Sequence, residues 1–240
     1  MASSSRSATL TTANRAALTL VLLAMTAVGL RGFVNSRFPL FGNHVHRVDT
    51  DENVVALTFD DGPHPQHTPR MLGLLDRHEV KATFFLMGRN VERYPEVARD
   101  VLARGHEIGN HSYSHPRMVF MSPGRMREEI ERTDALLRGI GLTGPIHFSP
   151  PHGSKLIVLP YVLAQMDKLS VLSDVDTEEW KRPGAAVLVA SALRQVRPGS
   201  VMAFHDTMGD ETLRAVDEVL TELLARGYRF ERVSELVGRR

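Results

Sequence analysis

The chain has 240 residues and a formal net charge of +1, with 42% hydrophobic and 24% charged residues. These values are typical of a globular protein with one large domain or two small ones, which can bury a sizeable core without disulfides. The near-neutral charge and the lack of a dense Lys/Arg stripe argue against a nucleic-acid partner. The absence of cysteine excludes disulfides and thiolate metal sites, whereas eleven histidines favour a search for metal-ligand spacing.

The N-terminal part differs in composition from the rest of the chain. No Asp or Glu precedes Asp49, and an apolar run of 15 residues at 16–30 has arginines on both sides. This pattern predicts a signal peptide or membrane anchor over 1–31, with a slight preference for the anchor, and a linker over 32–51. The protein is then exported, and either anchored facing the cell exterior or secreted. The run is short for a full span, which needs roughly 20 residues. An ordinary buried helix is the alternative, although the basic flanks and the lack of a polar helical face argue against it.

From residue 52 onward, short apolar runs alternate with helical patterns. Strands are expected at 54–59, 82–87, 106–110, 145–148, 169–175 and 200–204, and helices at 69–80, 94–105, 122–141 and 211–227. Strands that alternate with helices of this length predict parallel pairing and right-handed crossovers. About seven such units predict an α/β fold, a distorted (β/α) barrel smaller than the eightfold one. An open doubly wound sheet is the alternative.

Polar side chains follow nearly every predicted strand. In both parallel architectures the carboxyl ends of the strands carry the chemistry. Groups that can bind a metal or move a proton occur there at Asp60, Asp61, His111, His115, His152, Asp174, Asp176, His205 and Asp206. Each of these short patterns alone is more often a turn, a helix cap or a chance pair. Their concentration at successive strand ends favours one shared site.

The segment HSYSH at 111–115 spaces two histidines so that both can face one cation in a helical turn. Two imidazoles and one carboxylate, with positions left open, form a common catalytic set for Zn(II) and related ions. The carboxylate is available from the Asp60–Asp61 pair. One aspartate can bind the cation and the other can take a proton from the attacking water, which explains two adjacent charges at a buried strand end.

These motifs resemble the polysaccharide deacetylases of the NodB-homology group, carbohydrate esterase family four, over roughly residues 52–240. The matching segments, in the family's order, are TFDDGP (58–63), HSYSHP (111–116), FSPPHG (148–153), DTEEW (176–180) and VMAFHD (201–206). The resemblance implies a divalent metal, most simply Zn(II) with Co(II) or Ni(II) as alternatives, on Asp61, His111 and His115. It also implies a distorted barrel of about seven units.

The same resemblance implies the remaining roles. Asp60 is expected to be the catalytic base, and His205 the acid, oriented by Asp176. The backbone N–H of His152 is expected to hold the oxyanion. Pro151 and Trp180 are expected to contact the substrate, although a core position for the tryptophan is equally compatible with the sequence.

Four positions depart from the family pattern. Ser149 stands where the family has an arginine beside the catalytic base, and Glu179 where it has the aspartate that holds that arginine. His152 replaces a tyrosine and Ala203 a leucine. We therefore expect Glu179 to lack its usual partner and the pKa of Asp60 to lie above the family norm, because a nearby cation is missing. Lys155, Lys181 or Arg182 are candidates to replace that cation.

The resemblance implies a hydrolase that removes N-acetyl groups from an N-acetylglucosamine-containing polysaccharide such as peptidoglycan or a chitin-like polymer. Its partners are the acetylated glycan and, if the N-terminal segment is uncleaved, the membrane. Hydrolysis of O-acetyl esters is the second enzymatic alternative. The third is a weakly active glycan-binding homologue, because of Ser149.

Overall fold

The computed structural model describes residues 42–153 and 157–239, which lie in one compact unit of the chain, 37–240. The centre of this unit is a six-stranded sheet in the order β4-β3-β2-β7-β6, in which β8 also pairs with β2. Every pairing in it is parallel. Its strands are β2 (Val54–Asp60), β3 (Thr83–Leu86), β4 (Glu107–Asn110), β6 (Val175–Asp176), β7 (Val201–His205) and β8 (Arg229–Glu231). The expected α/β class with a parallel sheet is confirmed.

The strand order continues beyond β4. Parallel bridges join Asn110 to Phe148 and Phe148 to Ser170, and Ser170 begins β5 (Ser170–Val171), which pairs with β1 (His44–Val45). An antiparallel bridge between Arg47 and Ser200 then links the segment after β1 to the residue before β7. These links make the parallel sheet consistent with a distorted barrel.

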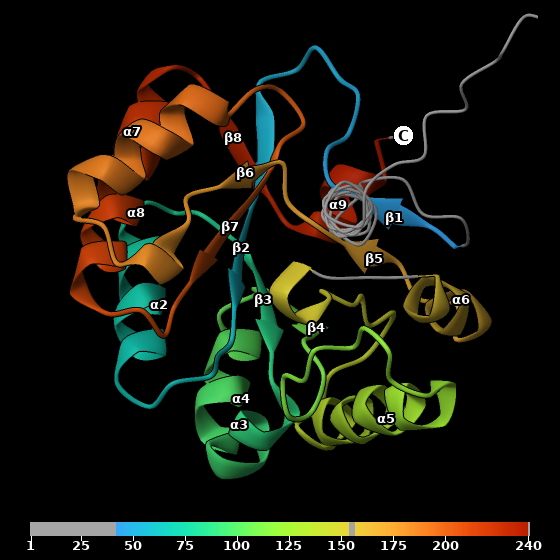
Figure 1. Ribbon diagram of the computed structural model, residues 1–240. Helices are drawn as coiled ribbons and strands as arrows, with labels where there is room; N and C mark the ends of the chain where they lie inside the picture. The colour runs from blue at the N-terminus through green and yellow to red at the C-terminus, as the bar shows by residue number, and fades with distance from the viewer. Residues whose placement is uncertain (1–41, 154–156, 240) are drawn as a thin grey trace, which may run out of the picture. The chain divides into compact units, whose positions relative to one another are not determined.

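Helices surround the strands (Figure 1). They are α2 (His67–Arg77), α3 (Gly88–Arg93), α4 (Pro95–Ala103), α5 (Pro123–Gly139), α6 (Val158–Gln165), α7 (Ala185–Gln195), α8 (Asp210–Ala225) and α9 (Val233–Val237), with 3-10 turns η1 (Pro151–Gly153) and η2 (Glu179–Lys181). The predicted helices correspond to α2, α4, α5 and α8. None of the described helices is both long and apolar enough to cross a membrane.

The two faces of β2 have different neighbours. Val55, Leu57 and Phe59 belong to the core cluster shared with α2, α4 and α8, whereas Val54 and Ala56 belong to a second cluster on the inner face. Because side chains alternate along a strand, Asp60 ends the inner-face series. In β7 the same alternation leads from Val201 on the inner face to His205. Strand periodicity therefore places Asp60 and His205 on one face, at the carboxyl ends of neighbouring strands.

Residues 42–51 were predicted to be part of a linker, but they belong to the fold. Val45 and Val48 are fully buried in the inner cluster. The backbone N–H of Val48 donates to the carbonyl of Gly199 at 2.9 Å. The folded part therefore starts before residue 52. The predicted signal or anchor, 1–31, and residues 32–41 of the predicted linker lie outside the described residues.

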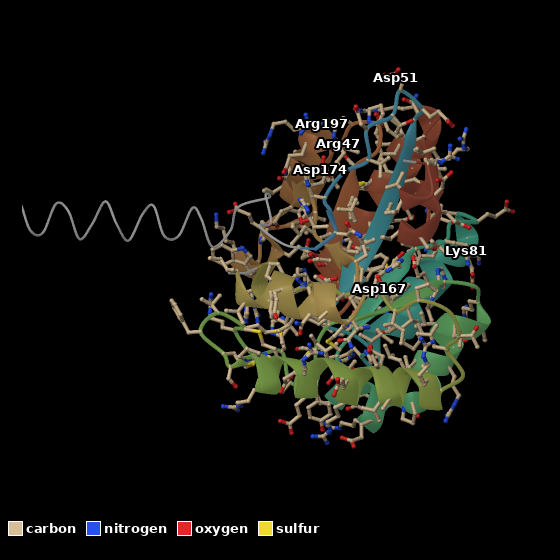
Figure 2. The ribbon with its side chains drawn as sticks, turned by 90° about the vertical axis from the view of Figure 1, so that its right-hand side faces the viewer. Arg47, Asp51, Lys81, Asp167, Asp174 and Arg197 are labelled. Carbon is tan, nitrogen blue, oxygen red and sulfur yellow. The ribbon has the colours of Figure 1, made fainter. Side chains whose placement is uncertain are left out.

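Asp174, expected at the strand-end site, directly precedes β6 and lies beside the beginning of β7 instead. Its carboxylate accepts hydrogen bonds from the Ser200 hydroxyl and the Val201 backbone N–H, both at 3.0 Å. Arg197 is 3.7 Å away, and Figure 2 shows both residues near Arg47. The carboxylate is buried at the opposite end of β7 from His205, so its contacts are structural.

Candidate active site

Asp60 and His205 are register partners at the ends of β2 and β7. Parallel pairing in register points both side chains to the same face, so the predicted base and acid are brought together. The Asp60 carboxylate accepts a hydrogen bond from the Ser149 hydroxyl at 3.1 Å through Oδ2. Its other oxygen, Oδ1, is buried and accepts no hydrogen bond from the described residues.

Asp61, His111 and His115 converge beside this pair. Asp61 Oδ1 lies 3.4 Å from His111 Nε2 and 3.2 Å from His115 Nε2, and donor atoms of the three residues all lie within 4.8 Å of one another. Two donors bound to one tetrahedral Zn(II) at about 2.0–2.1 Å are roughly 3.3 Å apart. Asp61 Oδ1 is also buried and accepts no hydrogen bond from the described part of the chain. The three predicted ligands thus fit a single divalent cation.

The His111 ring is oriented for metal binding. Its Nδ1–H donates to the backbone carbonyl of Ser149 at 2.8 Å, so the lone pair of the neutral tautomer is on Nε2, the atom that faces Asp61. The His115 ring packs edge-on against His152, with ring centroids 4.4 Å apart. Ser149 therefore serves the site twice, through its hydroxyl to Asp60 and through its carbonyl to His111.

The glycine of the Asp-Asp-Gly-Pro turn is required by Asp206. A Cβ at Gly62 would lie 2.8 and 2.9 Å from the two carboxylate oxygens of Asp206. Asp206 is buried, accepts a hydrogen bond from the Thr68 hydroxyl, and has a pKa raised to about 7, chiefly by burial. Asp61, directly before this glycine, has a left-handed backbone with φ of 73°. A side chain at position 62 would therefore displace the buried Asp206 carboxylate, next to the turn that carries Asp61.

The prediction that Asp176 orients His205 is wrong. Asp176 is exposed, and its carboxylate accepts the backbone N–H of Glu178 at 2.8 Å. Glu179 Oε2 instead lies 2.8 Å from His205 Nδ1, and its Oε1 accepts from the Thr212 hydroxyl at 2.5 Å. The loss of the arginine predicted that Glu179 would lack a partner. This prediction is wrong, because Glu179 contacts both His205 and Thr212. The left-handed backbone of Glu178, with φ of 55°, precedes the turn η2 that carries Glu179.

Local charges shift the pKa values of the site in opposite directions. Burial alone would lower the pKa of His205, but the hydrogen bond with Glu179 and the charges of Asp60 and Glu179 raise it to about 9. Burial raises the pKa of Asp60. Burial and the nearby charge of His111 lower the pKa of His115 to about 4. For Asp61, burial is outweighed by the nearby imidazoles, which lower its pKa. A protonated His205 therefore lies beside carboxylates, as a general acid requires.

The expected substrate-contacting residues differ in exposure. Trp180 is 66% exposed, so the alternative core position is wrong, and Lys181 Nζ lies 5.0 Å from its ring centroid. Pro151 is buried, and His152 has a left-handed backbone with φ of 60°.

Lys181, one of the candidates to replace the missing cation beside Asp60, pairs with Glu178 at 2.6 Å instead. The Asp60 carboxylate accepts its hydrogen bond from Ser149. Lys155 lies outside the described residues.

Comparisons with known proteins agree with this geometry. Residues 47–170 match the family model for polysaccharide deacetylase. The chain is 36% identical over 179 residues to a peptidoglycan-N-acetylglucosamine deacetylase of Bacillus cereus, covering 73% of this chain and 65% of that protein. It spans between 40% and 65% of the length of three of its curated relatives.

Two solved structures are similar over most of the chain. The peptidoglycan N-acetylglucosamine deacetylase Bc1960 has a TM-score of 0.77 at 32% identity, covering 80% of this chain and 92% of that one. A carbohydrate esterase family 4 pseudoenzyme from Bacillus anthracis has a TM-score of 0.76 at 31% identity, covering 82% of this chain and 69% of that one. The chain belongs to the polysaccharide deacetylase family, carbohydrate esterase family 4.

Proposed function

We propose that this protein is a metal-dependent hydrolase that removes N-acetyl groups from an N-acetylglucosamine-containing polysaccharide. The observation that carries the proposal is the convergence of three metal-ligand candidates, Asp61, His111 and His115, beside the register pair Asp60 and His205. A base and an acid on one face, next to a two-histidine, one-carboxylate donor set, are the groups that hydrolysis of an unactivated amide requires.

The chain's own groups divide the proton transfers between them. A divalent cation, when bound, would polarise the acetyl carbonyl and make a water molecule easier to deprotonate. Asp60 accepts the proton of that water as it attacks the carbonyl carbon. His205 gives its proton to the amine nitrogen as the C–N bond breaks. Glu179 stabilises the imidazolium and keeps its Nε2 available, because the carboxylate holds Nδ1.

The donor set supports Zn(II) as the simplest occupant. Two imidazoles and one carboxylate with further positions open are typical of catalytic zinc, and Co(II) or Ni(II) accept the same ligands. His152, next to His115 and within the turn η1, is proposed to offer its backbone N–H to the developing oxyanion. Trp180 is proposed to contact the sugar, since it exposes its ring next to Glu179, the residue that holds His205. Pro151, expected in the same role, is buried, so its exposure does not support a sugar contact.

Peptidoglycan is the favoured substrate, because the similar Bacillus cereus protein and Bc1960 are both named for its N-acetylglucosamine units. A chitin-like polymer offers the same acetamide. The proposed export of the protein agrees with a cell-wall substrate. The apolar run at 16–30 with basic flanks is typical of a signal peptide, which directs secretion, or of an anchor, which would hold the domain at the outer face of the membrane.

One observation favours a second, weaker activity. Asp60 is held by a neutral serine hydroxyl, and a structurally similar family member is a pseudoenzyme. A hydroxyl lacks the charge and the fork of a guanidinium, so the base is less well fixed. If this limits amide hydrolysis, the protein is a slow deacetylase, a glycan-binding homologue, or an enzyme restricted to O-acetyl esters. The alcohol that leaves from an ester depends less on protonation than the amine that leaves from an amide.

The deciding experiment is acetate release from peptidoglycan, from chitin oligosaccharides and from O-acetylated xylan after metal removal and add-back of Zn(II), Co(II) or Ni(II). We expect metal-dependent release from an N-acetylated glycan. His205→Ala should reduce release from an amide by about 10²–10⁴-fold and release from an ester far less. Full metal loading of the parent without release from any of the three substrates would contradict the proposal and favour a binding role.

A further inference from the structure

The loop between the two histidine ligands has an acceptor for each of its backbone N–H groups. Ser112 N–H donates to Asn110 Oδ1 at 2.7 Å, and His115 N–H donates to the Ser112 hydroxyl at 3.0 Å. The N–H groups of Tyr113 and Ser114 both donate to one oxygen of Glu129, at 3.0 and 2.8 Å. The path of residues 112–115 is therefore fixed by side chains, and half of these bonds depend on Glu129.

Glu129 projects from helix α5, which contributes none of the expected ligands. Besides the two backbone bonds to Oε2, its Oε1 accepts from the Ser114 hydroxyl at 2.8 Å. Hydrogen bonds to an ionised carboxylate are roughly twice as strong as neutral ones. One side chain thus makes three such bonds to two consecutive residues that immediately precede His115.

The loop needs this support because its backbone is strained. Ser112 and His115 have left-handed φ values of 61° and 58°. This conformation is unfavourable for residues other than glycine and persists only where the surroundings enforce it. Helix α3 holds the opposite side of the loop, where Gly88 N–H donates to the carbonyl of Ser112 and Arg89 N–H to that of Tyr113.

Helix α5 also supports the other end of the loop. Asp134 Oδ1 accepts from Asn110 Nδ2 at 2.8 Å, and the buried Lys168 ammonium lies 2.8 Å from Asp134 Oδ2. Asn110 directly precedes His111 and caps Ser112. Both histidines are therefore positioned from α5, His111 through Asn110 and His115 through Glu129.

We propose that Glu129 is a positioning residue that sets the metal affinity of the site by holding residues 113–114 and thereby His115. Glu129 touches no reacting atom, and this inference rests on the proposed metal-dependent function. Outer residues that orient ligands typically change metal affinity by roughly 10–100-fold when they are removed.

The test compares Glu129→Ala and Glu129→Gln with Glu128→Ala in the full-length chain. Glu128 is the exposed neighbour on the same helix, so it controls for loss of an acidic residue from α5. The dissociation constant for Zn(II) is measured by chelator competition, and the Co(II) absorption spectrum reports coordination geometry. We expect at least tenfold weaker Zn(II) binding and an altered Co(II) spectrum for Glu129→Ala, a smaller loss for Glu129→Gln, and parent-like values for Glu128→Ala.

A folded Glu129→Ala protein with the parent's Zn(II) affinity and Co(II) spectrum would overturn the inference. If Glu129→Ala does not fold, the Zn(II) affinities of Glu129→Gln and Ser114→Ala provide the test, because each variant weakens contacts between Glu129 and the loop. Parent-like Zn(II) affinity and Co(II) spectra in both would also overturn the inference. A parent that binds no Zn(II) would overturn both this inference and the proposed function. A parent that binds Zn(II) but releases no acetate would overturn the proposed function alone, while the ratio of dissociation constants still decides the role of Glu129.

Discussion

In the proposed mechanism, His205 is the residue whose protonation determines whether the site can cleave an amide. The amine leaving group must receive a proton. Burial lowers the pKa of His205, but the hydrogen bond with Glu179 and the charges of Asp60 and Glu179 together raise it to about 9. His205 is thus protonated through the neutral range. Activity on an amide should be present below about pH 9 and be lost as the pH rises through that value.

Glu179→Gln should move this alkaline limit downward. Glutamine keeps one carbonyl oxygen that can accept from His205 Nδ1, and its amide NH2 can donate to the Thr212 hydroxyl, but the negative charge that raises the pKa of His205 is removed. We expect the alkaline limb of the kcat/KM profile to shift to a pH about one to two units lower. Glu178→Gln is the matched control, because Glu178 is the exposed neighbour that binds Lys181 instead. An alkaline limb at the same pH in both variants would show that Glu179 does not govern the acid.

Ser149→Ala should affect the acidic limb. Burial raises the pKa of Asp60, and the Ser149 hydroxyl partly opposes this by donating to the carboxylate. Without the hydroxyl the pKa rises further, so the base is protonated, and activity is lost, at a higher pH. The shift of the kcat/KM profile should be about one pH unit, since a hydrogen bond to a charged group contributes roughly 1.5 kcal/mol or more.

Ser149→Thr is the control for this change, because threonine restores the hydroxyl. The backbone carbonyl that orients His111 is present in all three proteins, so metal affinity should change little. Equal acidic limbs in the alanine and serine proteins would mean that Asp60 is held by some other group.

At the scale of elements, the junction of β3 and β4 contains a pH-sensitive contact. His106, directly before β4, is buried and accepts the backbone N–H of Ala82 through Nδ1 at 3.1 Å. Accepting requires an unprotonated Nδ1, and burial lowers the pKa of His106 to about 4. The unfolded chain, with a pKa near 6.5, binds this proton first as the pH falls. The stability contributed by neutral His106 is therefore complete above about pH 6.5 and is lost toward pH 4.

The loss can be measured by urea unfolding at pH 7 and pH 4.5 in the presence of chelator. Between these two values the parent should lose about 2–3 kcal/mol through His106, and His106→Gln should lose less by about that amount. His115, whose pKa is also lowered to about 4, contributes equally to both proteins and cancels in the comparison. The same decrease in parent and variant would show that His106 is not responsible.

Which elements could be predicted depended on how regular their patterns were. Helices α2, α4, α5 and α8 follow apolar periods and strands β2, β3 and β7 are apolar runs, whereas the run that predicted β4 was weaker. The run 169–175 was expected as one strand, but its two ends pair with different neighbours, β5 with β1 and β6 with β7. Between them the Asp174 carboxylate accepts hydrogen bonds from Ser200 and Val201. Helices α3 and α9 are too short for a periodic signal, and α6 and α7 have few polar residues to mark a solvent face.

At the scale of the molecule, local motifs identified the site but not the contacts that complete it. Asp61, His111 and His115 were predicted from the two-histidine spacing and the resemblance, and the fold brings them together. The choice between Asp176 and Glu179 depended on the left-handed turn at Glu178, which no periodic pattern indicates. The support from Glu129 spans 15 or 16 residues of chain from the loop, so only the packing of α5 reveals it.

Residues 42–51 close the inner core, and Gly199 is the position where their contribution can be tested. Gly199 N–H donates to the carbonyl of Val54 at 2.7 Å, and its own carbonyl accepts from Val48. Its φ is +78°, and a Cβ there would overlap the carbonyl oxygen of Val48. Gly227 has the same φ of +78°, but a Cβ there would meet no atom within 4 Å. An alanine would therefore meet the same unfavourable φ at both positions, but only at Gly199 would it also collide with the N-terminal segment.

Gly199→Ala should consequently be more destabilising than Gly227→Ala. Both variants should lose about 1 kcal/mol from placing alanine in the left-handed region. Gly199→Ala should lose roughly 1–3 kcal/mol more, because Val48 must move away from the inner core. Urea unfolding of the two full-length variants measures the difference. Equal free energies of unfolding would mean that the segment around Val48 does not pack against β7 in solution, and the fold would then begin nearer to the predicted residue 52.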